Sequence, residues 1–567
     1  MAKQLKSKNN LEKNYTKHSI YDRLNRWFEQ NSYRWLLVVI AIGLICSILS
    51  FDIKPSVDGD DTSYVLSAMR IAHSGQLPIG FRTPGYPIVL SVFIWIFGVN
   101  LVILKATSLI FFLGIIISLF FVFRKRLQPV VLSSLLLLVA INPLMLKYSH
   151  QTFSEILFTL LLIWTIHFIL LSSEKESTTS APIAAVLTMA SFYIRIAGAT
   201  IAGVAVLFFA YQRRWKQLAV YIVLCAALYS PMKIYEWTSG SAAFGQASIL
   251  MLKNPYNTTE GMETASGFID RFINNIFNHA NYQLPSALGL SMPQELGAAD
   301  GQFIPNTSAF FGILISAILL VGCIAPIIRK PKSMMAFLGF FAVAYVAFIS
   351  VALQNIFATP RMLIPIIPYL IIGIFEGFRI LGNRWAKVTD AEAVSTRAKS
   401  LIFTAIIGLL LANIIGTKES IDKNYPILKA NLGGNEFAGF TEDWTNYLRA
   451  SVWIKSQLPI QSTGIICRKP ELFLLYAGNY NVYGTYKIDQ TNPDSIIAKW
   501  KSLNMTYLLY DNFQWTSTLR RYIQPVAEKY PQMFEMVHQE GLQYPSYIFH
   551  LNYNAITNTS TLQKEPR

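Results

Sequence analysis

The sequence predicts a polytopic α-helical membrane protein with an α/β domain at its carboxyl end, outside the membrane. Three observations lead to this fold class. Of the 567 residues, 53% are hydrophobic and only 14% are charged, the balance of a chain solvated largely by lipid. Long apolar runs recur as far as residue 417. Beyond that point the apolar stretches are shorter and are separated by polar ones, which is typical of a domain in water.

The apolar runs predict eleven membrane crossings, because a helix needs about 20 apolar residues to cross the hydrocarbon of a bilayer. They lie near residues 34–51, 103–123, 130–147, 154–172, 183–195, 198–211, 217–234, 308–328, 334–352, 362–381 and 400–417. A further apolar run, 84–98, is shorter. At about 1.5 Å per residue it reaches only roughly 21 Å, so we expect a juxtamembrane or re-entrant helix there.

The basic residues predict the orientation. If 84–98 does not cross, every Lys/Arg cluster falls on one side, as the positive-inside rule requires. These clusters lie in the first 33 residues and at 124–126, 213–214, 329–332 and 384–399. The net charge of +16 is thus concentrated at one membrane face, and we expect membrane lipids rather than nucleic acid as partners. The prediction is a multi-pass protein of a bacterial inner membrane, with a cytoplasmic amino terminus.

Three parts follow from this pattern: a cytoplasmic basic tail (1–33), a transmembrane module (34–417) and an extracytoplasmic α/β domain (418–567). The polar start does not fit a cleaved signal peptide, so we expect the first apolar run to be an anchor. In the last domain we predict helices at 443–457 and 517–538 and strands at 464–467, 507–510 and 547–551. The four cysteines lack the spacing of a zinc or redox site.

The first outer segment contains an acidic cluster. Asp58, Asp60 and Asp61 fall within four residues just beyond the first membrane helix, and Tyr64 follows. Such crowding raises the pKa of at least one carboxyl group unless a cation compensates. A general base or a metal ligand is the functional interpretation. The alternative is an Asp-rich turn that caps a helix starting near Thr62.

Three arginines are predicted at the outer ends of helices, against the positive-inside bias. Arg82 precedes the proline-rich start of the 84–98 run, Arg195 separates the two short helices, and Arg361 precedes a late helix. A planar guanidinium at headgroup depth suits a phosphate. The alternative for each arginine is an interfacial anchor.

The loop between the third and fourth crossings brings two more ionisable residues to the outer side, His150 and Glu155. An ionisable residue at the end of a membrane helix is a functional candidate because leaving it in lipid is costly. The alternative is helix capping by Ser154 and Glu155.

Together these motifs resemble the GT-C superfamily of polyprenyl-phosphate-sugar glycosyltransferases. The resemblance is to family 39, which includes protein O-mannosyltransferases and the lipid A aminoarabinose transferase, and it covers most of 34–417. Its carriers are Asp60-Asp61 with Tyr64, Arg82 before Pro84, Glu155 and Arg361. The family pair is often Asp-Glu, and its basic residue is often Lys before Pro-Pro. These departures leave open which aspartate is the base.

The resemblance implies inverting transfer of a hexose or pentose from a polyprenyl-phosphate donor to an extracytoplasmic lipid, glycan or protein. Asp60 or Asp61 would be the general base. The residues expected to bind substrate are Asp58, Tyr64, Arg82, His150, Glu155, Arg195 and Arg361. We expect no metal cofactor. The alternative is a divalent cation, which other branches of the superfamily use.

Two other functions fit a membrane protein with charged helix ends: a transporter or flippase of a lipid-linked or anionic substrate, and a membrane-anchored envelope assembly protein. A transporter predicts ionisable residues near the bilayer midplane and an internal repeat. Here the ionisable candidates gather at the predicted outer ends instead, and the sequence shows no repeat. The assembly function predicts that changes at Asp60 and Arg82 leave function intact.

Overall fold

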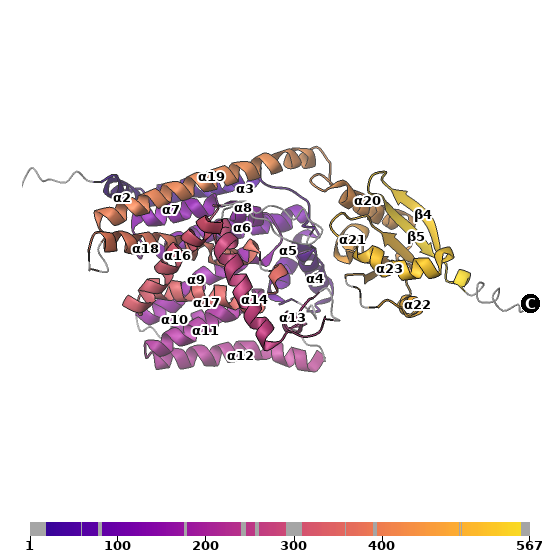
Figure 1. The fold of residues 1–567 in the computed structure, drawn as a ribbon, viewed down its shortest axis with the longest axis horizontal. Coiled ribbons are helices and arrows are strands. Elements are labelled where there is room, and N and C mark those ends of the chain that lie inside the picture. Colours follow the sequence, from indigo (N-terminus) through magenta and orange to yellow (C-terminus); the bar gives the residue numbers. More distant parts are fainter. Residues whose placement is uncertain are drawn as a thin grey trace, which may run out of the picture.

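The structure is a computed structural model that describes residues 19–556, except 58, 78–81, 175–178, 240–244, 256–259, 291–308, 358, 389, 391–393, 487 and 489. It consists of a large helical module and a smaller α/β domain at one end of it (Figure 1). All eleven predicted apolar runs lie on helices. The predicted fold class is therefore confirmed.

Eight helices in the described residues are long and apolar enough to cross a membrane. They are α3 (Ser32–Leu49), α6 (Leu101–Phe123), α9 (Ser154–Glu174), α12 (Trp215–Ser239), α16 (Ala309–Arg329), α17 (Met334–Ala352), η4 with α18 (Pro360–Ile366 and Ile367–Trp385) and α19 (Thr396–Leu432).

A ninth candidate span is broken in the middle. Helices α7 (Pro129–Ala140) and α8 (Pro143–Ser149) pass the same test together but are bent by 53°. The break has a local cause, because Pro143 has no N–H to continue the α7 hydrogen-bond ladder. Asn142 restarts the helix by accepting a hydrogen bond from the N–H of Met145. Beyond the bend, α8 packs against α9 and η4.

Shorter helices complete the module. Two match the predicted short crossings, α10 (Ser180–Ile194) and α11 (Gly198–Tyr211). The 84–98 run forms α5 (Gly85–Phe97), which packs against α4 (Asp60–Ser74). The others are α2 (Ile20–Gln30), α13 (Gly245–Leu250), α14 (Ala265–Asn278), η2 (His279–Gln283), α15 (Leu284–Ala287) and η3 (Asn355–Phe357).

The carboxyl-terminal domain is a five-stranded sheet with the order β2-β1-β3-β5-β4. Strands β1 (Gly464–Cys467), β2 (Asn481–Gly484) and β3 (Tyr507–Tyr510) are parallel, whereas β4 (Phe534–Glu540) and β5 (Ser546–Leu551) are antiparallel additions. Its helices are α20 (Glu442–Gln457), α21 (Pro470–Ala477), α22 (Pro493–Ser502) and α23 (Thr518–Lys529), with the short turns η5 (Ile460–Ser462) and η6 (Pro531–Met533). Apolar clusters cover both faces of the sheet, as expected for parallel strands.

One predicted element of this domain is wrong in part. The helix predicted over 517–538 ends at Lys529, and residues 534–540 form β4 instead. Pro531 follows directly on Tyr530, and the ring of a proline disfavours the helical conformation of the residue before it; Tyr530 has φ −133°. Residues 534–540 pair with β5 through backbone hydrogen bonds. The sequence of so short a segment does not reveal this pairing.

The two parts contact each other through the segment that leads into α4. The Lys54 ammonium donates to the carbonyl of Gly439 at 2.7 Å, and the Lys469 ammonium donates to the carbonyl of Val57 at 2.9 Å. Helix α21 also packs against α4. The carboxyl-terminal domain therefore lies directly beside the acidic segment, as Figure 1 also shows.

Candidate active site

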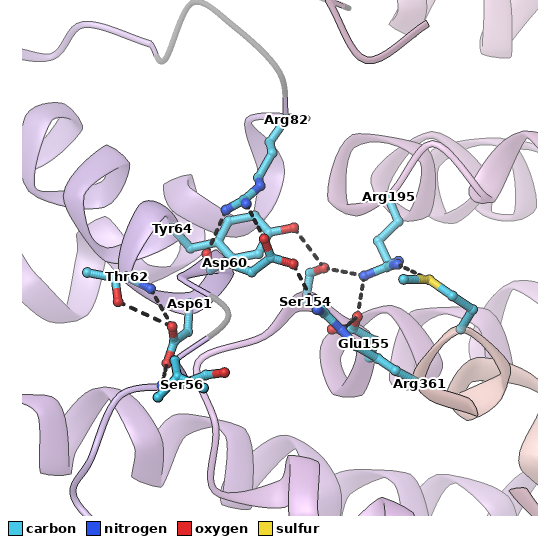
Figure 2. Close-up of polar contacts among 12 residues, drawn as sticks. Ser56, Asp60, Asp61, Thr62, Tyr64, Arg82, Ser154, Glu155, Arg195 and Arg361 are labelled. Atoms are coloured by element: carbon cyan, nitrogen blue, oxygen red, sulfur yellow. Dashed lines mark hydrogen bonds and ion pairs between the residues drawn. The ribbon is translucent and has the colours of Figure 1, made fainter. Parts of the chain in front are cut away.

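Helix α4 begins at the acidic pair. Gly59 precedes it with φ +82°, a left-handed conformation that glycine adopts without strain. Asp60 and Asp61 then occupy the first helical turn, where the helix dipole favours negative charge. The turn sends the two carboxylates in different directions, and Figure 2 shows Asp60 directed toward Arg82 and Arg361 while Asp61 faces Ser56 and Thr62.

Asp60 forms ion pairs with two arginines from distant parts of the chain. Its Oδ1 accepts from Nη2 of Arg82 at 2.5 Å, and its Oδ2 accepts from Nη1 of Arg361 at 2.8 Å. Arg82 also donates to the backbone carbonyl of Asp60. The Asp60 side chain is 35% exposed, so this pair of contacts lies at the edge of the site and not in the packed core.

Glu155, at the start of α9, extends the network. Its Oε1 accepts from Nε of Arg361 at 2.6 Å and from Nη1 of Arg195 at 2.7 Å. Its other oxygen, Oε2, is buried and has no hydrogen-bond partner among the residues that the structure describes. We call Asp60, Arg82, Glu155, Arg195 and Arg361 the arginine cluster. Three guanidinium groups against two carboxylates leave it one positive charge in excess, which is the complement of a singly charged phosphodiester.

A close contact between helices brings Arg82 near Arg195. A Cβ atom on Gly85, at the start of α5, would lie 2.6 Å from the carbonyl oxygen of Tyr193 near the end of α10. Only glycine permits that approach. The Thr83 hydroxyl also donates to the carbonyl of Ile194. The two segments are thereby held together, and each carries its arginine to the same place.

Aromatic and hydroxyl groups complete the surroundings. The guanidinium of Arg361 lies 4.0 Å from the centre of the Phe153 ring, and that of Arg82 lies 4.7 Å from the Tyr64 ring. Ser154 links both sides, because its hydroxyl is 3.2 Å from the Tyr64 hydroxyl and accepts from Arg195 at 2.9 Å. Such contacts fix the direction in which the guanidinium groups point.

The two aspartates differ in acidity as well as direction. Burial alone would raise the pKa of Asp60, but the charges of Arg361 and Arg82 outweigh it and lower that pKa to about 2. Burial raises the pKa of Asp61 to about 6, although hydrogen bonds from Ser56 and Thr62 and the charge of Lys105 oppose it. Asp61 is almost fully buried, with 1% of its surface exposed.

The structure brings Asp60, Tyr64, Arg82, Glu155, Arg195 and Arg361 together. Asp61 lies behind them, where its carboxylate accepts from the N–H groups of Ser56 and Thr62 at 2.6 and 2.7 Å. Asp58 lies outside the described residues. His150 is not part of the cluster: it is buried, and its Nε2 lies 3.8 Å from Oδ2 of Asp52.

Lys105 is a buried residue near the site that the sequence reasoning missed. Its ammonium donates to the carboxylate of Asp52 at 2.7 Å and to the backbone carbonyls of Asp52 and Lys54 at 2.8 and 2.5 Å. These bonds hold the start of the acidic segment against α6. The sequence does contain a signal for this residue, because a lysine inside an apolar run needs a partner for its ammonium group.

No cluster of three or more His, Cys, Asp or Glu with the geometry of a metal site occurs among the residues that the structure describes. Both carboxylate oxygens of Asp60 are engaged by arginines. The positive charge that surrounds this carboxylate is supplied by protein side chains.

Comparisons with known proteins show the fold. No known protein-family profile matches the sequence, and no curated protein is similar enough in sequence to count as a match. ArnT from Cupriavidus metallidurans in the apo state aligns over 92% of this chain and 98% of its own, with 13% identity and a TM-score of 0.54. The same protein bound to undecaprenyl phosphate aligns over 91% and 98%, with the same identity and score.

The archaeal oligosaccharyltransferase AglB from Archaeoglobus fulgidus, in complex with an inhibitory peptide and a dolichol-phosphate, is also similar. It aligns over 92% of this chain and 74% of its own, with 14% identity and a TM-score of 0.51. These proteins are GT-C glycosyltransferases. The chain therefore has the GT-C fold, and the predicted resemblance is confirmed at the level of the fold.

Proposed function

We propose that this chain, which has the GT-C fold, is an integral membrane glycosyltransferase that moves a sugar from a polyprenyl-phosphate donor to an extracytoplasmic acceptor. The observation that carries the proposal is the arginine cluster. Three arginines from separate segments converge on two carboxylates and leave an excess positive charge beside a general-base candidate. Because ArnT has been captured with undecaprenyl phosphate and AglB with a dolichol-phosphate, a lipid phosphate is the ligand class that both fold and charge favour.

In this proposal the guanidinium groups of Arg82 and Arg361 bind the donor phosphate. As the bond between the anomeric carbon and the phosphate oxygen breaks, the electron pair and the negative charge stay on the leaving polyprenyl phosphate. Fixed cations beside that oxygen stabilise the developing charge. A metal ion is then not needed for this step, since the arginines already supply the charge.

Asp60 is the general base of the proposed reaction. An acceptor hydroxyl attacks the anomeric carbon from the face opposite the phosphate and gives its proton to Asp60, so the configuration inverts without a covalent intermediate. An aspartate with a pKa of about 2 is a weak base. A phosphate that takes over Arg82 and Arg361 adds negative charge and withdraws the opposing cations, which raises the pKa of Asp60 once the donor is bound.

The other members of the cluster have supporting roles in this scheme. Arg195 holds Glu155, whose free Oε2 is placed to accept a hydrogen bond from a sugar hydroxyl. Asp61 holds the turn before α4 through its bonds to Ser56 and Thr62. By the positive-inside rule the cluster faces the outside of a bacterial inner membrane, with the carboxyl-terminal domain in the same compartment.

Mass spectrometry of envelope lipids and glycans tests the proposal. Cells that lack the protein, and cells that carry Asp60→Asn, are expected to lose the same sugar modification and to accumulate the same polyprenyl-phosphate-linked sugar. Cells that carry Arg379→Gln, a change in an ion pair with Glu376 well along α18, serve as the matched control. Unchanged glycans and lipids in the deletion would contradict the proposal.

A further inference from the structure

The carboxyl-terminal domain has a group of side chains at the edge of its sheet that the proposed chemistry does not use. Each of the three parallel strands is followed at its carboxyl end by a member: β1 by Arg468 and Lys469, β2 by Tyr486, and β3 by Asp511 and Trp515. We call these five residues the sheet-edge cluster. Ligands of open α/β sheets bind at the carboxyl ends of the strands, where neighbouring connections run to opposite sides.

The topology places that switch point between β1 and β3. From β1 the chain passes through α21 to β2 on one side, and then returns through α22 to β3 on the other side. Arg468 and Asp511 follow these two strands directly. The sheet-edge cluster therefore occupies the position in the sheet where a ligand site is expected from topology alone.

Aromatic rings frame the cluster. The Arg468 guanidinium lies 5.0 Å from the centre of the Trp515 ring and 5.7 Å from that of Tyr486. Trp515 is 37% exposed and Tyr486 is 38% exposed, whereas Arg468 is 4% exposed. Trp515 is held in place, because it stacks on the buried Trp444 with an angle of 3° between the rings. Two partly exposed aromatic rings thus lie near one buried guanidinium group.

Polar groups of both kinds surround these rings. Arg468 and Lys469 supply donors, while Glu471 accepts from the Tyr486 hydroxyl. Oδ2 of Asp511 is buried and has no hydrogen-bond partner within the described part of the chain. Burial raises the pKa of Asp511 to about 7. Such an oxygen accepts when ionised and can donate when protonated. Sugars fit this mixture, because their hydroxyls donate and accept while their ring faces are apolar.

The cluster is tied to the acidic segment. Lys469 lies 5.0 Å from the Trp515 ring and donates to the carbonyl of Val57, three residues before Asp60. Its ammonium would lie 3.7 Å from a Cβ on Gly59. A molecule seated at the sheet edge would therefore begin next to the amino-terminal end of α4, where the proposed base is located.

We propose that the sheet-edge cluster of Arg468, Lys469, Tyr486, Asp511 and Trp515 binds the acceptor and that the acceptor is a saccharide. This inference rests on the proposed function, which supplies the need for an acceptor, and it narrows the acceptor to a glycan or a glycolipid headgroup. Trp515 and Tyr486 contact the sugar ring, and Arg468 with Asp511 contacts its hydroxyls. Lys469 is a positioning residue that couples this site to the acidic segment.

The test measures saccharide binding by the full-length protein in lipid nanodiscs on an array of neutral oligosaccharides. Wild type is expected to bind at least one of them, and Trp515→Ala to bind it about tenfold more weakly or not at all, because a stacked aromatic anchor is lost. Trp515→Phe keeps a ring and should retain most of the binding. Trp453→Ala, which removes a tryptophan stacked on His538 of β4, is the matched control and should bind like wild type.

Tyr486→Ala provides a second variant in case Trp515→Ala does not fold, and a thermal melt of each variant reports folding. Absence of saccharide binding by wild type would overturn the inference, as would equal binding by wild type and a folded Trp515→Ala or Tyr486→Ala. Binding of undecaprenyl phosphate is recorded in parallel. If Arg82→Ala weakens binding of undecaprenyl phosphate but Trp515→Ala leaves saccharide binding unchanged, only this inference fails. If Trp515→Ala weakens saccharide binding but Arg82→Ala leaves binding of undecaprenyl phosphate unchanged, the proposed function fails and the saccharide site stands.

Discussion

Asp60 and Arg361 form an ion pair across 301 residues of sequence, with Nη1 of the arginine 2.8 Å from Oδ2 of the aspartate. The same guanidinium reaches Glu155 through its Nε at 2.6 Å. Arg361 therefore joins the start of α4 to the start of α9. The arginine cluster has three cations and two anions. A bound phosphate would add a third anion, so it can pair with Arg361 and balance the charge of the cluster.

Replacing Asp60 by Asn should abolish transfer while the fold is kept. Asn is of similar size, but it has no carboxylate to accept a proton, so we expect the turnover number to fall by at least about 10²-fold. The measurement is the release of polyprenyl phosphate from its glycosylated form by the reconstituted protein. A melting temperature close to that of wild type shows that the loss is chemical.

Asp61→Asn is expected to behave differently. Both oxygens of Asp61 accept hydrogen bonds, from the backbone N–H groups of Ser56 and Thr62. In Asp61→Asn the amide nitrogen would replace one of these oxygens, and it cannot accept the hydrogen bond because it is itself a donor. We expect a lower melting temperature, corresponding to about 1–3 kcal/mol for an unsatisfied buried group. A wild-type melting temperature together with complete loss of activity would instead make Asp61 the base.

The pH dependence separates the same two assignments. A general base must be ionised, so activity falls below its pKa, and kcat/KM reports the pKa of the free enzyme. With Asp60 as base, whose pKa is about 2, kcat/KM should show no acid limb near pH 6. The kcat profile should show its limb at a higher pH than kcat/KM does, because bound phosphate removes the arginines from Asp60.

An acid limb near pH 6 in kcat/KM would point to Asp61, whose pKa is raised to about 6. The raised pKa of Asp61 also makes the free energy of unfolding depend on pH. The protonated form of Asp61 is favoured in the folded protein, so its contribution is fully present below about pH 4 and is lost as the pH rises through about 6.

Lys105→Met should destabilise the protein strongly. It would leave the buried carboxylate of Asp52 without its lysine, and breaking a buried ion pair from one side costs about 3–5 kcal/mol. The double variant Lys105→Met with Asp52→Asn should recover part of the lost melting temperature. Lys418→Met, which removes an exposed ion pair with Asp422, is the control and should melt like wild type.

Equal melting temperatures for Lys105→Met and wild type would contradict the structural role of Lys105. A lower melting temperature for Lys105→Met than for the double variant would support this role. The loss of stability would then come from the unpaired carboxylate of Asp52.

The helical framework was predictable because long apolar runs have few alternatives to membrane helices. All eleven runs lie on helices, from α3 to α19. The broken α7–α8 pair was predicted as one run, since Asn142-Pro143 interrupts the backbone and not the hydropathy. In the carboxyl-terminal domain β2, α21 and α22 were missed. Helices α21 and α22 are too short for a helical period to be recognised, and β2 lacks the buried apolar residues that mark β1 and β3.

The candidate site was predictable in its residues but not in its geometry. Sequence order and charge singled out Asp60, Arg82, Glu155 and Arg361, and their convergence depends on contacts such as Gly85 on α10. The different directions of Asp60 and Asp61 follow from helical geometry, which places adjacent residues on different faces. Lys105 lay inside an apolar run and His150 at a helix end, and only the fold reveals that both contact Asp52.

Binding of undecaprenyl phosphate to the purified protein in nanodiscs tests the central claim most directly. Wild type should bind it, and Arg82→Ala should bind at least about tenfold more weakly, because a charge-assisted contact to the phosphate is lost. Arg379→Gln, in an ion pair with Glu376 on α18, should bind like wild type. Equal affinity of wild type and a folded Arg82→Ala, or no binding by wild type, would contradict the assignment of the arginine cluster as a lipid-phosphate site.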